Sequence, residues 1–384
     1  MKTIKRLPLS ALVLSISSVV ASSAVLADDD FNFTGYGRLG MAYQTADETA
    51  VSPEGAYNGS STMGRLGNEG PGGEIQFNKA FEGENGSQWD IVIMAENWGG
   101  STFNNKKFYA GGKNLFESQP DMYVWAGRNF NQRPQQGLND YAWMTHDGQG
   151  AGFQNMDLGF AQLDLSFVGQ ADGLADSGYY AVTSKLAGIA AGPASIDLYF
   201  NYGFQNDEVI TTDTIDAYQI GSQINTALGK VTLRYSANSD DTVLYSWNTG
   251  LKDETTNIYA SFESGVNVND NISVDYLLAY HNRNDDNDDS NTRVNYSGIV
   301  RPMIAWDDVH STWLEAGYTM VDYTEIDSTN TAWKFTASQN LAIGKGAGAR
   351  PMLRFYTTVG NEDNESTSTE SDILTVGAMF EAWW

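Results

Sequence analysis

The chain has 384 residues, of which 12% are aromatic and 39 are glycine, and it carries a formal net charge of −26 with no cysteine. The charge argues against nucleic-acid partners, whose phosphates it would repel, and the lack of cysteine excludes a disulfide framework. Only 41% of the residues are hydrophobic and no amphipathic helical pattern is found, so the sequence fits neither a helical membrane protein nor a helix-rich soluble one.

The first 27 residues have the character of a secretory signal peptide. Basic residues precede an apolar run from about Leu9 to Val20, and small residues lead to Ala27, which three aspartates follow. This order predicts export and cleavage after Ala27. Residues 28–384 are then expected to form a single domain, and they contain no apolar run near the roughly 18 residues that a spanning helix needs.

The rest of the chain consists of short segments in which apolar and polar residues alternate, separated by polar turns. The clearer segments are Phe31–Gln44, Glu74–Phe81, Gln88–Ala95, Met122–Phe130, Met156–Gly169, Tyr179–Ala187, Ser195–Phe204, Asp216–Ile224, Lys230–Ser236, Asn257–Glu263, Ile272–His281, Arg293–Trp306, Thr312–Val321, Thr331–Leu341, Arg350–Val359 and Ser371–Trp384. A weaker one or two lie near Tyr141 to Gln154, so the count is about 17 or 18.

Alternate residues of these segments form two faces of different composition. In the last segment, Leu374, Val376 and Phe380 share an apolar face, whereas Thr375 and Glu381 share the other. Successive side chains of a strand point to opposite faces, and charges on an inner face suit a water-filled channel rather than a dry core. The pattern predicts an all-β transmembrane antiparallel β-barrel, and because such barrels have an even number of strands, we predict 18.

The segment Phe31–Gln44 gives the first indication of function. Tyr36 and Arg38 fall on the same face, opposite Leu39. In a pore, an aromatic ring can stack on the apolar face of a sugar while a guanidinium donates to its hydroxyls. Trp383 should lie nearby, because the first and last strands of a closed barrel are neighbours. The alternative is that Tyr36 and Arg38 merely fill the lumen.

Six motifs, in this order along the chain, resemble those of the maltoporin family. They are Phe33-Thr-Gly-Tyr-Gly-Arg38, Arg65-Leu-Gly-Asn-Glu69, Gly112-Lys-Asn-Leu115, Trp125-Ala-Gly-Arg-Asn-Phe-Asn-Gln-Arg133, Gly150-Ala-Gly152 and Glu381-Ala-Trp-Trp384. The resemblance implies an 18-stranded barrel of the bacterial outer membrane, embedded in its lipid and assembled as a homotrimer, with an inward-folded third loop that constricts each pore. It also implies facilitated diffusion of maltose and maltodextrins along a row of aromatic residues flanked by polar ones.

The same resemblance assigns eight residues to ligand binding. Tyr36 and Trp383 match aromatics of the row, and Trp98 matches an aromatic that a neighbouring subunit contributes to the pore entrance. The matching polar residues are Arg38, Glu74, Lys106, Arg133 and Asp140.

Other positions depart from the family pattern. Glycine at 72 or 73, Ala142 and Gly348 stand where the family has aromatic residues, and Gln135 replaces an aspartate. Fewer rings should weaken the retention of maltodextrins or admit different sugars. Tyr141, Trp143 and Tyr199 are candidates to replace the missing rings.

Three alternatives to a maltodextrin porin stay open at this point: a porin for a different sugar, a general diffusion porin that filters by size and charge, and a receptor role for the outer loops. No serine and histidine are placed together by the sequence, so no enzyme is expected.

The sequence predicts no cofactor and no metal site. Asn284–Ser290 and Asn361–Ser366 offer clustered oxygens of the kind that calcium prefers, but without the ordered spacing of a calcium loop. We expect them to be hydrated outer loops that bind divalent cations loosely at most. His146, His281 and His310 are the only histidines, and none has a metal-ligand spacing.

Overall fold

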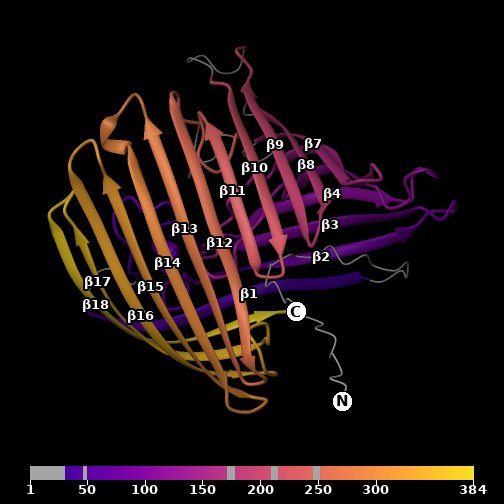
Figure 1. The fold of residues 1–384 in the computed structure, drawn as a ribbon. Helices are drawn as coiled ribbons and strands as arrows, with labels where there is room; N and C mark the ends of the chain where they lie inside the picture. Colours follow the sequence, from indigo (N-terminus) through magenta and orange to yellow (C-terminus); the bar gives the residue numbers. More distant parts are fainter. Residues whose placement is uncertain (1–30, 46–49, 171–177, 209–214, 245–250) are drawn as a thin grey trace, which may run out of the picture.

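The computed structural model describes residues 31–45, 50–170, 178–208, 215–244 and 251–384. These residues contain eighteen β-strands and two short 3-10 helices (Figure 1). No helix within the described ranges is long and apolar enough to cross a membrane. The predicted signal peptide, residues 1–27, lies outside the described residues.

The strands follow one another along the chain with two helical turns between them. They are β1 (Phe31–Gln44), β2 (Gly72–Glu82), β3 (Gln88–Asn97), β4 (Asn104–Lys113), β5 (Tyr123–Asn129), β6 (Gly148–Asp157), β7 (Gln162–Gln170), β8 (Tyr179–Ala191), β9 (Ala194–Gln205), β10 (Ala217–Thr226), β11 (Gly229–Ala237), β12 (Thr255–Asn269), β13 (Ile272–Asp285), β14 (Arg293–Ala305), β15 (His310–Tyr323), β16 (Ser328–Ala342), β17 (Met352–Asn364) and β18 (Thr369–Trp383), with η1 (Gly59–Met63) and η2 (Asp289–Asn291).

The strands close into one barrel. Each pairs antiparallel with the next strand in the chain, and β1 also pairs with β18. At this seam Tyr36 lies opposite Trp383 and Arg38 lies opposite Glu381. The predicted all-β barrel of 18 antiparallel strands is therefore confirmed, and its closure brings the two ends of the chain together.

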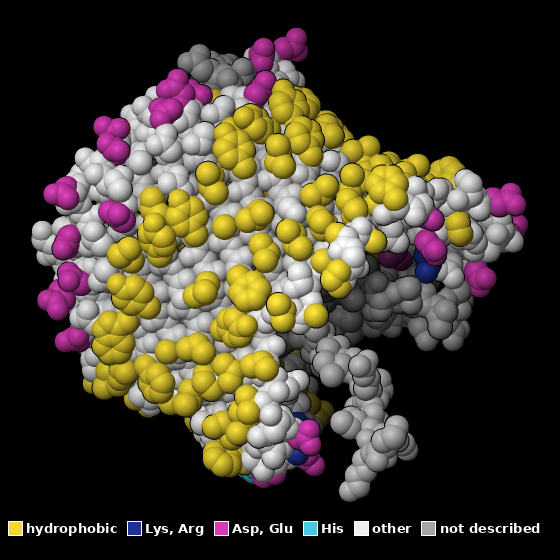
Figure 2. All heavy atoms as spheres, viewed as in Figure 1, with side chains coloured by type: hydrophobic (Ala, Val, Ile, Leu, Met, Phe, Trp, Pro, Cys, Tyr) yellow, Lys and Arg dark blue, Asp and Glu magenta, His cyan; other side chains and the backbone are white. Residues whose placement is uncertain are grey.

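The two faces of the strands differ as the alternation predicts. In β18, Leu374, Val376 and Phe380 are between 37% and 49% exposed on the outside, whereas Thr375 and Glu381 are at most 1% exposed on the inside. Apolar side chains spread over the outer wall, and acidic ones gather along the left edge of the view, where strands end (Figure 2). An apolar exterior around a polar interior is the composition of a barrel that spans a membrane.

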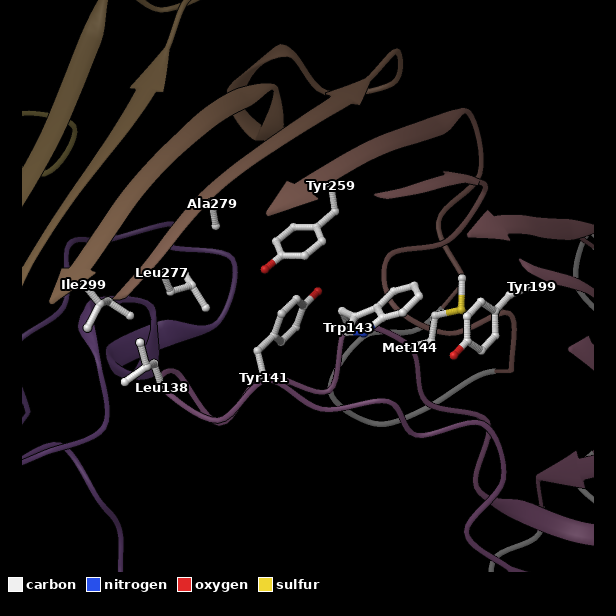
Figure 3. Close-up of a cluster of buried hydrophobic side chains, with 9 residues drawn as sticks. All are labelled: Leu138, Tyr141, Trp143, Met144, Tyr199, Tyr259, Leu277, Ala279 and Ile299. Atoms are coloured by element: carbon white, nitrogen blue, oxygen red, sulfur yellow. The ribbon is translucent and has the colours of Figure 1, made fainter. Parts of the chain in front are cut away.

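Among the described residues, three connections fold into the lumen, and one of them is residues 238–244 after β11, in which Val243 and Leu244 are buried. Residues 130–147, between β5 and β6, form the predicted constriction loop, and Tyr141 and Trp143 of this loop are buried against the barrel wall (Figure 3). Residues 50–71, between β1 and β2, were not expected to fold inward, yet Met63 and Leu66 are fully buried. The Leu66 amide donates to Glu315 Oε1 at 2.9 Å, which fixes this first loop to β15.

Three details of the predicted strands are wrong. The strand β4 was missed, because its first four residues are all polar and hide the alternation. The predicted segment Met156–Gly169 is the end of β6, a turn and β7, since Gly159 takes a positive φ of 82° that reverses the chain. Part of the acidic stretch Asn361–Ser366 is not a loop, because β17 continues to Asn364.

Candidate functional site

Three aromatic rings lie side by side on the inner wall near the seam of the barrel. Tyr36 of β1 is the middle one, with its ring centroid 6.0 Å from that of Trp98 and 6.4 Å from that of Trp383. Trp98 directly follows β3 and Trp383 ends β18. Trp98 is 41% exposed and Trp383 is 38% exposed, so both indoles remain accessible. We call these residues the lumen aromatics.

Glycine at position 72 makes room for Trp98. A Cβ atom on Gly72 would collide with the Trp98 ring and with the backbone of the same residue. The indole therefore occupies the space into which a side chain at position 72 would project, beside Tyr36 of its own chain. The family pattern has an aromatic residue at position 72 or 73, where this chain has glycine. Trp98, from the connection that follows β3, occupies the space beside Gly72 instead.

Glu381 positions two of the lumen aromatics, Tyr36 directly and Trp383 through Arg350. Its Oε1 accepts a hydrogen bond from the Tyr36 hydroxyl at 2.9 Å. Its Oε2 accepts from Arg350 Nε at 2.9 Å and Nη2 at 2.5 Å, and the Arg350 guanidinium lies 4.6 Å from the centroid of Trp383. Glu381 was not among the predicted site residues, although the alternation in β18 places it on the inner face, two residues before Trp383.

Further guanidiniums surround this carboxylate. Arg354 Nη2 lies 3.2 Å from Glu381 Oε2, and Arg65, from the first inward loop, also forms an ion pair with Glu381. Glu69 of the same loop pairs with Arg354 at 2.5 Å. Because a buried charge is costly unless it is paired and hydrogen-bonded, this network fixes the first loop and the lumen aromatics in one arrangement.

Arg38 connects Trp98 to the constriction loop. Its guanidinium carbon is 5.1 Å from the centroid of Trp98, and Nη1 forms an ion pair with Asp140 at 3.2 Å. Its Nε donates to the carbonyl oxygen of Gly70 at 2.8 Å. Arg38 and Asp140, both of which the resemblance assigns to ligand binding, therefore lie together beside the lumen aromatics.

Two further predicted polar residues, Lys106 and Glu74, lie on the adjacent wall. Lys106 pairs with Glu96 at 3.0 Å, and Glu96 accepts a hydrogen bond from Trp98 Nε1 at 3.2 Å. Glu74 lies between Tyr36 and Glu96 in the sheet register.

Arg133, the remaining predicted polar residue, lies in the connection between β5 and β6 and contacts two other residues. It pairs with Asp147 at 3.2 Å and stacks 4.5 Å from the centroid of Phe130. Sequence reasoning missed Glu96 and Asp147 because their roles depend on how the connections fold.

The aromatics of the constriction loop serve as anchors. Tyr141 is 5% exposed and Trp143 is 1% exposed, and Trp143 packs edge-on against Tyr199 with centroids 5.2 Å apart. Figure 3 shows Tyr141 directed towards Tyr259 of β12 and Trp143 lying between Tyr141 and Met144. Their faces are covered, so the described structure does not offer Tyr141, Trp143 or Tyr199 as open rings in place of the missing ones.

Burial and nearby charges shift the pKa values of three groups in the connections. Burial alone would raise the pKa of Glu69, but the Arg354 and Arg65 guanidiniums outweigh it and lower this pKa to about 2. Burial lowers the pKa of Arg350 to about 10, against the opposing effect of Glu381. Burial, reinforced by Arg234, lowers the pKa of His146 to about 3. At neutral pH, His146 is uncharged and Glu69 is ionised.

Within the described ranges, no group of three or more histidines, cysteines or carboxylates could hold a metal ion. The acidic run at the end of β13 forms a turn in which Asp288 caps η2 through the Ser290 amide. The chemistry available at the seam is therefore that of aromatic rings, carboxylates and guanidiniums.

Comparison with known proteins gives a consistent result. The model of the LamB porin family matches residues 31–384. Proteins named maltoporin from two Vibrio cholerae serotype O1 strains are each 27% identical to this chain over 422 aligned residues, covering 98% of this chain and 99% or 98% of theirs.

Solved structures resemble the chain in fold. The crystal structure of Pseudomonas aeruginosa OccD3 (OpdP) superposes with a TM-score of 0.51 at 10% identity, over 92% of this chain and 91% of that chain. A triple mutant of Rhodopseudomonas blastica porin gives a TM-score of 0.44 at 11% identity, over 92% and 100% of the two chains.

Proposed function

This chain belongs to the LamB porin family, and on that premise we propose that maltodextrins diffuse through it along Tyr36, Trp98 and Trp383. Membership of the family makes the protein a sugar porin of the bacterial outer membrane, which is a channel rather than an enzyme. The closed barrel with an apolar exterior agrees with this assignment. The substrate and the path of the sugar are our proposal.

One observation supports this path most strongly: the three lumen aromatics form a continuous platform. Neighbouring centroids are 6.0 and 6.4 Å apart, so a sugar that leaves one ring meets the next without crossing open water. Aromatic faces bind the apolar C–H faces of pyranose rings, as they bind other apolar surfaces. Binding by one ring at a time also remains weak enough for the sugar to move on, which transport requires.

The polar residues around the platform supply hydrogen bonds to sugar hydroxyls. Arg38 and Asp140 lie at the Trp98 end, and Glu74 and Lys106 lie on the neighbouring strands. Arg133 would act further along the same wall, beside Phe130. We propose that donors and acceptors alternate along the path, so that each hydroxyl exchanges one partner for another.

A second candidate is a porin for a different sugar. It is favoured by the short platform, since Tyr141, Trp143 and Tyr199 are buried and Gly348 offers no ring. Three rings would hold a short or branched sugar about as well as a long linear one. The two candidates therefore differ in how affinity changes with chain length.

The assembly and export of the protein are also proposals. We propose that it is exported with cleavage of residues 1–27 and inserts into outer-membrane lipid as a homotrimer. The exposed apolar side chains of the barrel support lipid contact. Mass spectrometry of the purified protein would show whether the mature chain begins at Asp28, and cross-linking in detergent would show whether it is trimeric.

The test of transport is single-channel current through the purified protein in a planar bilayer. Maltohexaose, sucrose and a non-sugar polymer of similar size are added in turn. Saturable block by maltohexaose alone supports the maltodextrin proposal. Block by sucrose alone supports the second candidate, a porin for a different sugar. If none of the three blocks the current, the platform does not bind sugars and the protein is a general diffusion porin.

A further inference from the structure

A second group of aromatic rings and a carboxylate lies inside the barrel, apart from the lumen aromatics. It consists of Asp90 of β3, Tyr109 of β4 and Tyr123 of β5. The Tyr123 hydroxyl donates to Asp90 Oδ1 at 2.5 Å, and the hydroxyls of Tyr109 and Tyr123 also interact. The arrangement repeats that of Tyr36 and Glu381, in which a phenol donates to a carboxylate.

The sheet directs this group into the lumen. Ile91 and Phe108, the neighbours of Asp90 and Tyr109 in sequence, are 41% and 56% exposed on the outer face. Lys107 shares the face of Tyr109 and donates to Gln76 at 3.0 Å inside the barrel. Because successive side chains alternate, Asp90 and Tyr109 point inward.

The group lies near the end of the barrel opposite the inward loops. Asp90 is the third residue of β3 and Tyr123 is the first of β5, and both strands begin at that end after a short connection. Glu96, at the level of Tyr36 in the register, is six residues further along β3. At about 3.3 Å per residue, the two aromatic groups are separated by about 20 Å along the strand.

The ring of Tyr123 lies against bare backbone. A Cβ atom on Gly111 would collide with the tip of this ring, so the glycine lets the phenol lie flat on the wall. Tyr109 is supported from behind by Trp125, whose ring is edge-on to it with centroids 6.2 Å apart. Both rings also pack against the buried cluster that contains Trp125. Tyr109, Tyr123 and Asp90 are nevertheless partly exposed, and because they point inward, their exposed parts border the lumen.

We propose that Asp90, Tyr109 and Tyr123 form a second sugar subsite, which holds a pyranose ring at the end of the pore remote from the inward loops. The phenol faces take the apolar side of the sugar, and the Asp90 carboxylate accepts from its hydroxyls. This inference rests on the proposed sugar transport. It adds that a long oligosaccharide is held at two places, whereas a disaccharide occupies one at a time.

The test compares variants of the full-length channel in a planar bilayer. Tyr123→Leu removes the ring, Tyr123→Phe removes only the hydroxyl, and Tyr318→Leu removes a tyrosine that is 50% exposed on the outer wall. We expect Tyr123→Leu to weaken block by maltohexaose about two- to tenfold, as the loss of one aromatic contact does. Block by maltose should change less, and Tyr318→Leu should match the wild type. The affinity of Tyr123→Phe for maltohexaose should lie between that of Tyr123→Leu and that of the wild type.

The outcomes separate this inference from the proposed function. A change in electrophoretic migration on boiling, equal to that of the wild type, confirms that each variant folds. If Tyr36→Leu weakens block by maltohexaose while Tyr123→Leu behaves as the wild type, the second subsite does not exist but sugar transport stands. If no sugar blocks the wild type, both proposals fall together. An equal loss of affinity for maltose and maltohexaose in Tyr123→Leu also overturns the two-place model.

Discussion

Tyr36 and Glu381 are joined across the seam of the barrel by a hydrogen bond of 2.9 Å, in which the phenol donates to the carboxylate. The same carboxylate binds Arg350, which stacks on Trp383. Glu381 is fully buried, so neither contact is exchanged readily for water. One acid therefore sets the orientation of two lumen aromatics and balances the charges around them.

Replacing Glu381 with glutamine should destabilise the barrel. Glutamine keeps the shape but removes the charge that balances Arg65, Arg350 and Arg354. Breaking a buried pair in this way costs about 3–5 kcal/mol of unfolding free energy, measurable by urea titration in detergent. Glu370→Gln, at the exposed start of the same strand, should change it by less than about 0.5 kcal/mol. Equal effects of the two substitutions would contradict a central role for Glu381.

Tyr36 should bind sugar through its ring more than through its hydroxyl. Tyr36→Leu removes the middle ring of the platform, and we expect maltohexaose affinity to fall by about 0.5–1.5 kcal/mol, or about two- to tenfold. Tyr36→Phe keeps the ring and should lose less. Current block at a series of sugar concentrations gives both affinities, and an effect of Phe as large as that of Leu would show that the hydroxyl matters more.

Gly72→Ala should displace Trp98. The new methyl group would collide with the indole and with backbone atoms of Asn97 and Trp98, and Gly72 takes a positive φ of 156°. Trp98 must therefore leave its place beside Tyr36, backbone included, and we expect sugar affinity to fall at least as much as for Trp98→Ala. Gly192→Ala is the matched control, because Gly192 also takes a positive φ, of 62°, and a Cβ atom there meets nothing within 4 Å. If sugar blocks the Gly72→Ala channel with the same affinity as the wild type, Trp98 does not bind sugar from its place beside Tyr36.

Acid should loosen the constriction loop through His146. Its Nε2 accepts a hydrogen bond from the Val243 amide at 3.3 Å, and its pKa is lowered from 6.5 to about 3. A lowered pKa favours the neutral form, so the stabilisation is complete above pH 6.5 and decreases as the pH falls towards 3, by about 1.4 kcal/mol per pH unit. We expect current fluctuations to increase below about pH 5, where the loss reaches about 2 kcal/mol.

A pair of variants isolates this effect. His146→Gln keeps an acceptor for the Val243 amide and cannot become charged, so its fluctuations should depend less on pH. His310→Gln changes an exposed histidine at the start of β15 that pairs with Asp307, and it should keep the pH dependence of the wild type. If both variants behave alike, a group other than His146 responds to acid.

The strands were predictable from sequence to the extent that their two faces differ. In β18, apolar and polar residues alternate strictly, and both the strand and its inner face were predicted correctly. In β4, polar residues fall on both faces at the start, so the period of two is lost and the strand was missed. The count of 18 was still correct, because it also depended on both termini lying on one side of the barrel.

The site was predictable only where it lies on strands. Tyr36, Arg38 and Trp383 follow from alternation and from closure of the sheet. The contacts of Trp98, Asp140 and Glu69 depend on how the connections fold into the lumen, and no periodic signal in a loop specifies that. The departures from the family pattern were visible in the sequence, but the filling of the space at Gly72 by Trp98 required the structure.

The pairing of β1 with β18 has a consequence for biogenesis. Tyr36 is among the first residues of the barrel to be made and Trp383 is the next-to-last residue of the chain, yet they face each other in register. A nascent or partly inserted sheet has neither the platform nor the ion network around Glu381. The proposed sugar binding is thus a property that arises only when the barrel has closed, and ligand-dependent quenching of tryptophan fluorescence would report that closure directly.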